Sequence, residues 1–245
     1  MFKTLLKVRF LGLISGMFPV SYTHLTPFGH AGEKALDAVC PGGFKHNEQS
    51  LRVVDLLENS GLGLNLSYEV RMGILGHTWG SRIPETLEGR IVRYADRIAY
   101  INHDIDDALR AGVIRDSDIP SELTDFLGDT HGKRIDSMTK DLIKNSADDI
   151  KLSEEMTYAM GRLREFMFER VYRNPVAKSE ELKAPHILTS LFNHYVEHPE
   201  ELPVEKSTVH DSIERRAVDY VAGMTDTFAV YKFKELFIPA GWQGR

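Results

Sequence analysis

Apolar residues recur at helical spacing along most of the chain from residue 26 onward, and no run of alternating β-branched residues interrupts them. The clearest case follows Ser153, a residue type that caps helix N-termini, where Met156, Met160 and Leu163 recur every three or four positions. One face of such a helix is apolar and packs against other helices. The pattern therefore predicts an all-α fold, and we expect a single domain.

Capping residues, glycine and proline set the boundaries of these helices. Asn47 is a candidate N-cap, Pro84 opens the longest helix, and Gly112 lies just beyond its end. The segment 197–207 has the composition of a surface loop. We predict helices over residues 33–39, 47–61, 67–75, 84–109, 121–127, 134–145, 153–167, 186–198 and 209–236.

The first 25 residues differ from the rest of the chain. Basic residues precede a short apolar run at 10–20, which is too short and too broken by glycine to span a bilayer. No small-residue cleavage site follows this run. We therefore expect neither a signal peptide nor a membrane-spanning segment, here or elsewhere in the sequence.

Charge and cysteine content narrow the class of protein. A net charge of −6 over 245 residues gives no basic surface for a nucleic acid. Cys40 is the only cysteine, which excludes an intramolecular disulfide and fits a reducing compartment. We predict a cytoplasmic location and assign this thiol no chemical role.

The helix predicted over 84–109 carries an unusual polar stripe. Asp96, Tyr100 and Asp104 recur every four residues and share one face. Carboxylates in this pattern suit a hard cation or a sugar hydroxyl, and the tyrosine ring suits stacking on a ligand. Three isoleucines repeat every seven residues on the opposite side and are expected to pack into a bundle: Ile91, Ile98 and Ile105.

A purely structural interpretation of the stripe is also open. Arg93 lies three residues before Asp96 and could form an ordinary helix ion pair with it. The neighbouring Asp106 and Asp107 could be plain solvated charge.

A second candidate site lies in the segment "TPFGHAGE", where a turn precedes a helix. His30 and Glu33 are three residues apart, so their side chains lie on one face of that helix. An imidazole beside a carboxylate is suited to proton transfer at a polar site.

Five segments stand in collinear order between Thr26 and Pro239: "TPFGHAGEKAL", "GGFKHNEQSLRVVDLLE", "GLNLSYEVRMGILGH", "ADRIAYINHDIDDALRAG" and "DYVAGMTDTFAVYKFKELF". Together they resemble the deoxyguanosinetriphosphate triphosphohydrolases, which are dNTP triphosphohydrolases of the HD-domain superfamily. The resemblance does not extend upstream of Thr26.

This resemblance implies a helical HD-domain bundle that acts on dNTP substrates. In such enzymes water attacks the α-phosphorus of a deoxynucleoside triphosphate and releases a deoxynucleoside and tripolyphosphate. A divalent cation, Mg²⁺ or Mn²⁺, neutralises phosphate charge, and the proteins form homo-oligomers.

The resemblance also assigns roles to individual residues by position. Asp96 corresponds to a metal-binding aspartate, and His30 and Glu33 correspond to the catalytic pair near the scissile phosphorus. Residues that correspond to substrate-binding positions are Tyr100, Asp104, Asn47 and Gln49.

The chain departs from the family pattern directly upstream of "TPFGHAGE". Ser21 and Tyr22 occupy the positions of a metal-binding His-Asp doublet, and His24 stands where the family has glycine. The helix that carries an earlier histidine ligand has no counterpart in residues 1–20. We therefore expect residues 1–25 to be a non-native or disordered leader, and 26–245 to be a partial, N-terminally truncated domain that lacks the family's first helices.

Three hypotheses follow from this departure. The first is a dNTP triphosphohydrolase, and the second is an inactive HD-fold module that binds nucleotides without hydrolysing them. The third is an HD-type hydrolase of phosphomonoesters or cyclic nucleotides, which Tyr100 and Asp104 disfavour because both fit the triphosphohydrolase pattern.

Overall fold

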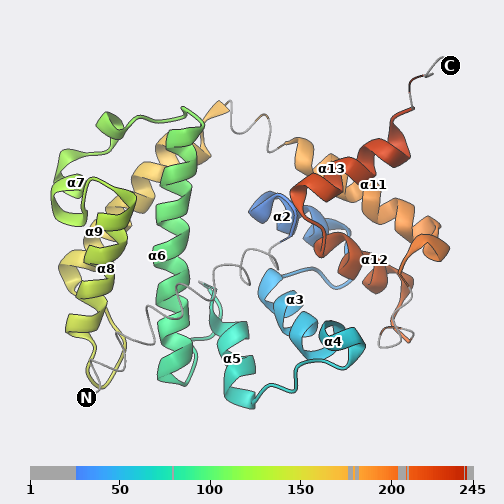
Figure 1. Cartoon of the computed structure of the whole chain (residues 1–245), viewed down its shortest axis with the longest axis horizontal. Helices are drawn as coiled ribbons and strands as arrows, with labels where there is room; N and C mark the ends of the chain where they lie inside the picture. Colours follow the sequence, from blue (N-terminus) through green and yellow to red (C-terminus); the bar gives the residue numbers. More distant parts are fainter. Residues whose placement is uncertain are drawn as a thin grey trace. The chain divides into compact units, whose positions relative to one another are not determined.

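The computed structural model describes residues 26–78, 80–175, 179, 182–203, 208, 210–239 and 241. Helices account for its regular structure, and no strand occurs among these residues, which confirms the predicted all-α fold (Figure 1). The predicted leader at 1–25 lies outside the described residues. In the part that is described, no helix is long and apolar enough to cross a membrane.

The α-helices vary from one turn to more than six. They are α2 (Gly29–Val39), α3 (His46–Arg52), α4 (Glu58–Gly61), α5 (Tyr68–Gly76), α6 (Leu87–Arg110), α7 (Ser121–Leu127), α8 (His131–Asn145), α9 (Glu154–Met167), α11 (Lys183–Glu197), α12 (Ile213–Ala222) and α13 (Asp226–Phe237). Two π-helical segments, η1 (Val53–Leu57) and η3 (Phe168–Tyr172), continue α3 and α9. Two 3-10 turns are η2 (Asp116–Asp118) and η4 (Pro199–Glu201).

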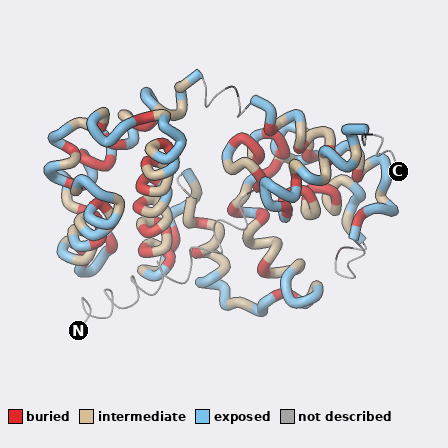
Figure 2. Tube along the Cα trace, turned by 45° about the horizontal axis from the view of Figure 1, so that its top comes forward, coloured by how far each residue is buried: buried red, intermediate tan, exposed pale blue. Residues whose placement is uncertain are grey.

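The chain divides into two compact units, and each is described here by itself. Among the described residues, 72–175 belong to the first unit, and 26–71 together with 179–241 belong to the second. Each unit has its own cluster of buried apolar side chains. Figure 2 marks these buried positions in red along the helices.

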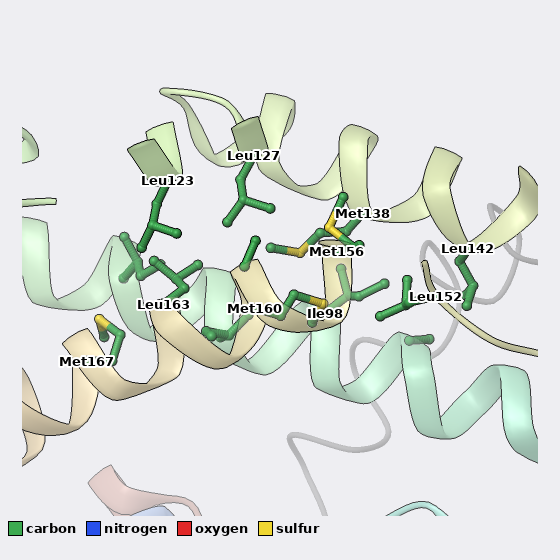
Figure 3. Packing of buried hydrophobic residues seen from close by; sticks show 14 of the residues in the cluster. Ile98, Leu123, Leu127, Met138, Leu142, Leu152, Met156, Met160, Leu163 and Met167 are labelled. Carbon is green, nitrogen blue, oxygen red and sulfur yellow. The ribbon is translucent and has the colours of Figure 1, made fainter. Parts of the chain in front are cut away.

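The first unit is built around α6. Its three heptad-spaced isoleucines are 4%, 1% and 0% exposed, which confirms the predicted apolar face of this helix. Side chains of α7, α8 and α9 complete this core, and Figure 3 shows the methionines and leucines of these helices pointing toward one another. The labelled members are Ile98, Leu123, Leu127, Met138, Leu142, Leu152, Met156, Met160, Leu163 and Met167.

The second unit packs α11 against α2, α12 and α13 (Figure 1). Leu36 of α2 and Leu188 and Leu191 of α11 are fully buried at this core. Cys40 is also buried there, as expected of a thiol without a chemical role.

The predicted cap of α3 is wrong, because the N-cap residue is Lys45, two residues earlier. The helix begins at His46, and Asn47 lies buried in its first turn. The backbone N–H of His46 instead donates to Glu33 Oε1 at 2.9 Å, so a carboxylate from α2 satisfies a free N–H group of this helix. A tertiary contact has replaced the local cap.

The predicted helix over 209–236 is two helices. Gly223 ends α12, and the Thr225 hydroxyl accepts a hydrogen bond from the N–H of Phe228 and thereby caps α13. At this break Met224 lies in the core and is 5% exposed. Apolar residues recur at helical spacing on both sides of this boundary, so their spacing did not reveal it.

The start of the longest helix also differs from the prediction. Thr86, not Pro84, precedes the first turn of α6, and its hydroxyl accepts from the N–H of Gly89 at 3.1 Å. Ser153 does cap α9, accepting from the N–H of Met156, and this prediction is confirmed.

Candidate active-site residues

Glu33 joins α2 to α3 through two hydrogen bonds to one residue. Its Oε1 lies 2.9 Å from the backbone nitrogen of His46 and 2.7 Å from His46 Nδ1. Burial tends to raise the pKa of Glu33, but these hydrogen bonds outweigh burial and lower that pKa below its usual value. An ionised Glu33 accepts hydrogen bonds from His46 and thereby fixes the orientation of its imidazole ring.

His30 lies one turn before Glu33 on the exposed side of α2. The centre of its ring is 6.4 Å from that of His46, and the two rings are nearly perpendicular. The structure therefore groups His30, Glu33 and His46 in one cluster, which we call the α2 site. Sequence spacing identified two of its three members.

The predicted substrate contacts on α3 lie deeper than the α2 site. Asn47 and Gln49 are both buried. Gln49 Nε2 donates to Asp219 Oδ1 at 2.8 Å, and Arg215 donates to Gln49 Oε1. Both ends of the Gln49 amide are thus engaged with α12, and a substrate contact by either residue stays a prediction.

On α6, Asp104 and Tyr100 form a cluster with a tyrosine from η3. Tyr172 donates a short hydrogen bond to Asp104 Oδ2. Burial and the adjacent Asp104 carboxylate raise the pKa of Tyr100 to about 12 and that of Tyr172 further. Both phenols therefore stay protonated at neutral pH and act as hydrogen-bond donors.

Two guanidinium groups adjoin this cluster. Burial, and then the positive charge of Arg164 on α9, lower the pKa of Arg97 on α6. The same Arg164 charge also acts on Tyr100. We call Arg97, Tyr100, Asp104, Arg164 and Tyr172 the α6 site. Arg97 is half-buried and Arg164 is exposed, and two like charges that act on each other favour an anionic ligand.

Asp96 lies half-buried on α6, one residue before Arg97. Within the described part of the first unit, it belongs to no group of three metal-donor side chains with ligand atoms inside 4.8 Å. One carboxylate is a poor match for the oxygen ligands that Mg²⁺ or Mn²⁺ requires. The metal role of Asp96 therefore stays a prediction, and the residues described here do not by themselves form the cation site.

Four members of the two sites were absent from the sequence prediction: His46, Arg97, Arg164 and Tyr172. His46 stands in "GGFKHNEQS", next to two residues that were singled out. Arg97 follows Asp96 directly. No sequence signal placed Tyr172 beside Asp104, because 68 residues separate them.

Comparison with known proteins first defines the class. Residues 150–235 match the family model of the phosphohydrolase-associated domain. This stretch runs from the start of α9 through most of α13 and includes Arg164 and Tyr172.

Comparison with individual proteins then defines the family. Over 221 residues the chain is 48% identical to a deoxyguanosinetriphosphate triphosphohydrolase-like protein of Caldanaerobacter subterraneus subsp. tengcongensis, covering 89% of this chain and 65% of the relative. A protein of that name from Clostridium perfringens is 41% identical, with 86% and 66% covered. One from Geobacter sulfurreducens is 35% identical, with 87% and 70% covered.

This chain belongs to the family of deoxyguanosinetriphosphate triphosphohydrolase-like proteins. It spans just under two thirds of the length of the first two relatives. The resemblance found in the five sequence segments is thereby confirmed.

Proposed function

We propose that the chain takes part in hydrolysing a deoxynucleoside triphosphate, of the dGTP type, to the deoxynucleoside and tripolyphosphate. The observation that carries this proposal is the composition of the α6 site. It combines a carboxylate between two protonated phenols with two neighbouring guanidinium groups. A sugar hydroxyl and a polyphosphate chain are the groups that such a set would bind.

Asp104 supplies the contact for the sugar. Its ionised carboxylate accepts from a hydroxyl donor, such as the 3′-hydroxyl of a deoxyribose. Tyr172 holds this carboxylate through its own hydrogen bond, and the Tyr100 ring, which is 37% exposed, offers an apolar face to the sugar.

Arg97 and Arg164 supply the contacts for phosphate. The repulsion between their charges is relieved when an anion lies between them, and a guanidinium can donate two parallel hydrogen bonds to phosphate oxygens. A triphosphate gains from both effects.

The proton chemistry is assigned to His30 and Glu33 by the family resemblance alone. In that assignment an imidazole accepts a proton from water as its oxygen attacks the α-phosphorus. The bond from that phosphorus to the 5′ oxygen then breaks, and the proton returns to this oxygen. The hydrogen bond between Glu33 and His46 supports the proposal, because it pairs the carboxylate with a second imidazole in the α2 site.

A divalent cation, Mg²⁺ or Mn²⁺, belongs to the proposal as a family expectation, and it would neutralise phosphate charge when bound. Because Asp96 is the one described residue assigned to it, we expect weak cation binding there in the absence of substrate. A homo-oligomer is likewise expected, and light scattering after size-exclusion chromatography tests it.

The decisive experiment measures tripolyphosphate release from dGTP by ³¹P NMR, alongside dGTP binding by calorimetry. We expect Glu33→Gln to lower kcat at least tenfold and Asp104→Asn mainly to raise KM. Asp107→Asn is the matched control, because Asp107 is an exposed carboxylate of α6 that pairs with Arg110 outside the α6 site. If the chain binds dGTP without hydrolysing it, the second hypothesis, an inactive module that binds nucleotides, takes the place of the enzyme hypothesis. If Asp104→Asn leaves both dGTP binding and tripolyphosphate release unchanged, the assignment of the α6 site is wrong.

A further inference from the structure

A cluster of metal-donor side chains lies at the C-terminal end of α11, apart from the residues of the α2 site. His198 is the residue that ends this helix, and Glu200 and Glu201 follow in η4. One donor atom from each of the three lies within 4.8 Å of the other two. We propose that these three side chains bind a first-row divalent cation, with Zn²⁺ as the preferred ion.

The distance between two of the donor atoms matches the spacing of two ligands on such an ion. His198 Nδ1 lies 3.4 Å from Glu200 Oε1, which is long for an N–H···O hydrogen bond. Two ligands of a tetrahedral Zn²⁺, with bonds of about 2.0–2.1 Å, stand about 3.3 Å apart. Glu200 is 70% exposed, so its side chain has room to adjust to a bound ion.

Glu201 is held by a further histidine. His194 Nε2 lies 2.9 Å from Glu201 Oε2, and the His194 ring packs edge-on against Tyr195 and Phe237 at 5.3 and 5.9 Å. A carboxylate ligand that is itself hydrogen-bonded by an oriented side chain is a common feature of metal centres. His194 is therefore a positioning residue in this proposal.

The backbone around the cluster is fixed from both sides. His198 donates its N–H to His194 O at 2.8 Å, and the N–H of Glu201 donates to His198 O at 3.1 Å. Tyr195 and Leu202 anchor the turn in the core, with exposures of 2% and 4%. The donors thus project from a rigid turn rather than from a loose loop.

The charges and the donor atoms of these three side chains favour Zn²⁺. Two carboxylates this close repel each other, and a bound dication removes the repulsion. One imidazole with two carboxylates is a borderline set, for which Zn²⁺ is bound more tightly than Mn²⁺. The cationic Lys232 of α13 acts on Glu201 but pairs with Glu235 at 2.7 Å.

The test is a calorimetric titration of the whole chain with Zn²⁺, combined with thermal unfolding. We expect Glu200→Gln and His198→Ala to lose one equivalent of Zn²⁺ or to weaken that equivalent at least tenfold. Glu197→Gln is the matched control, since Glu197 is an exposed carboxylate of the same helix end that lies outside the cluster. It should bind as the unmodified chain does.

Two further measurements keep this inference separate from the proposed function. Asp96→Asn should leave the Zn²⁺ equivalent unchanged, because Asp96 is not part of this cluster. Zn²⁺ should raise the Tm of the unmodified chain and of Glu197→Gln, but not that of Glu200→Gln. Identical Zn²⁺ titrations for the unmodified chain, Glu200→Gln and His198→Ala would overturn the proposal, whatever the outcome for dGTP.

Discussion

The carboxylate of Asp219 on α12 accepts several hydrogen bonds from α3. It is 8% exposed and accepts from Arg52 Nε and Nη2, from Gln49 Nε2 and from Arg215 Nη2 at 2.7–2.9 Å. Asp219→Asn replaces an oxygen acceptor by an NH₂ donor that faces these guanidinium groups. Two partly buried cations, Arg52 and Arg215, then lose this carboxylate while the fold around them stays the same.

The expected cost follows from this geometry. Breaking a buried ion pair by removing one partner costs about 3–5 kcal/mol. Because Arg52 also binds Asp211, it keeps one carboxylate, and we expect the lower end, about 3 kcal/mol. For a chain of this size that corresponds to a fall in Tm of about 6–12 °C.

The assay is urea unfolding at pH 7 followed by circular dichroism, with Asp211→Asn as the graded comparison. The Asp211 side chain is 29% exposed and Arg52 would keep Asp219, so this variant should lose about 1 kcal/mol or less. Equal losses in the two variants, or a loss below about 1 kcal/mol in Asp219→Asn, would refute the reasoning.

The pH dependence gives a second test of the same carboxylate. Burial tends to raise the pKa of Asp219, but hydrogen bonds from Arg52, Gln49 and Arg215 outweigh burial and lower it below 3.8. The contribution to stability is therefore fully present above pH 3.8 and is lost as pH falls through the lowered value. The difference between the unmodified chain and Asp219→Asn should hold constant from pH 7 to about 5 and shrink under stronger acid.

Three further predictions concern stability and use the same unfolding assay. Leu163→Ala removes a fully buried side chain of α9 and should cost about 2–5 kcal/mol; a cost below 1 kcal/mol would mean that the first unit repacks. Ser153→Ala deletes the cap of α9 and should cost about 1 kcal/mol, whereas Ser153→Asp should restore most of it. Gly128→Ala forces a side chain into a backbone with φ +112° and places a methyl 2.5 Å from Lys133 Cβ, so it should cost more than about 1 kcal/mol; a neutral result would show that the α7–α8 turn can shift.

Local signals predicted much of the fold. The heptad of isoleucines found the buried face of α6, the bounds of α7 were predicted to the residue, and Ser153 marked the start of α9. These features depend on residues close together in the sequence, where spacing and capping chemistry can be read directly.

Long-range contacts explain what local signals missed. Glu33 caps α3 from another helix and so displaced the cap predicted at Asn47. Tyr172 reaches Asp104 across 68 residues. Spacing along one helix identifies the residues that this helix contributes to a site. The residues that other helices contribute can be identified only from the fold.

The π-helical turn η3 has a consequence for how the α6 site tolerates change in chain length. A π turn accommodates one residue more than an α-helical turn of the same height. Removing one residue from Phe168–Val171 would turn this π turn into a regular α-helical turn, and the residues after it would keep their direction. The same deletion within Glu154–Met167 would instead rotate every later side chain by about 100° around the helix axis. Tyr172 would then lose Asp104 although its identity is unaltered. The position of this phenol is thus encoded in the number of residues before it as much as in the residue itself.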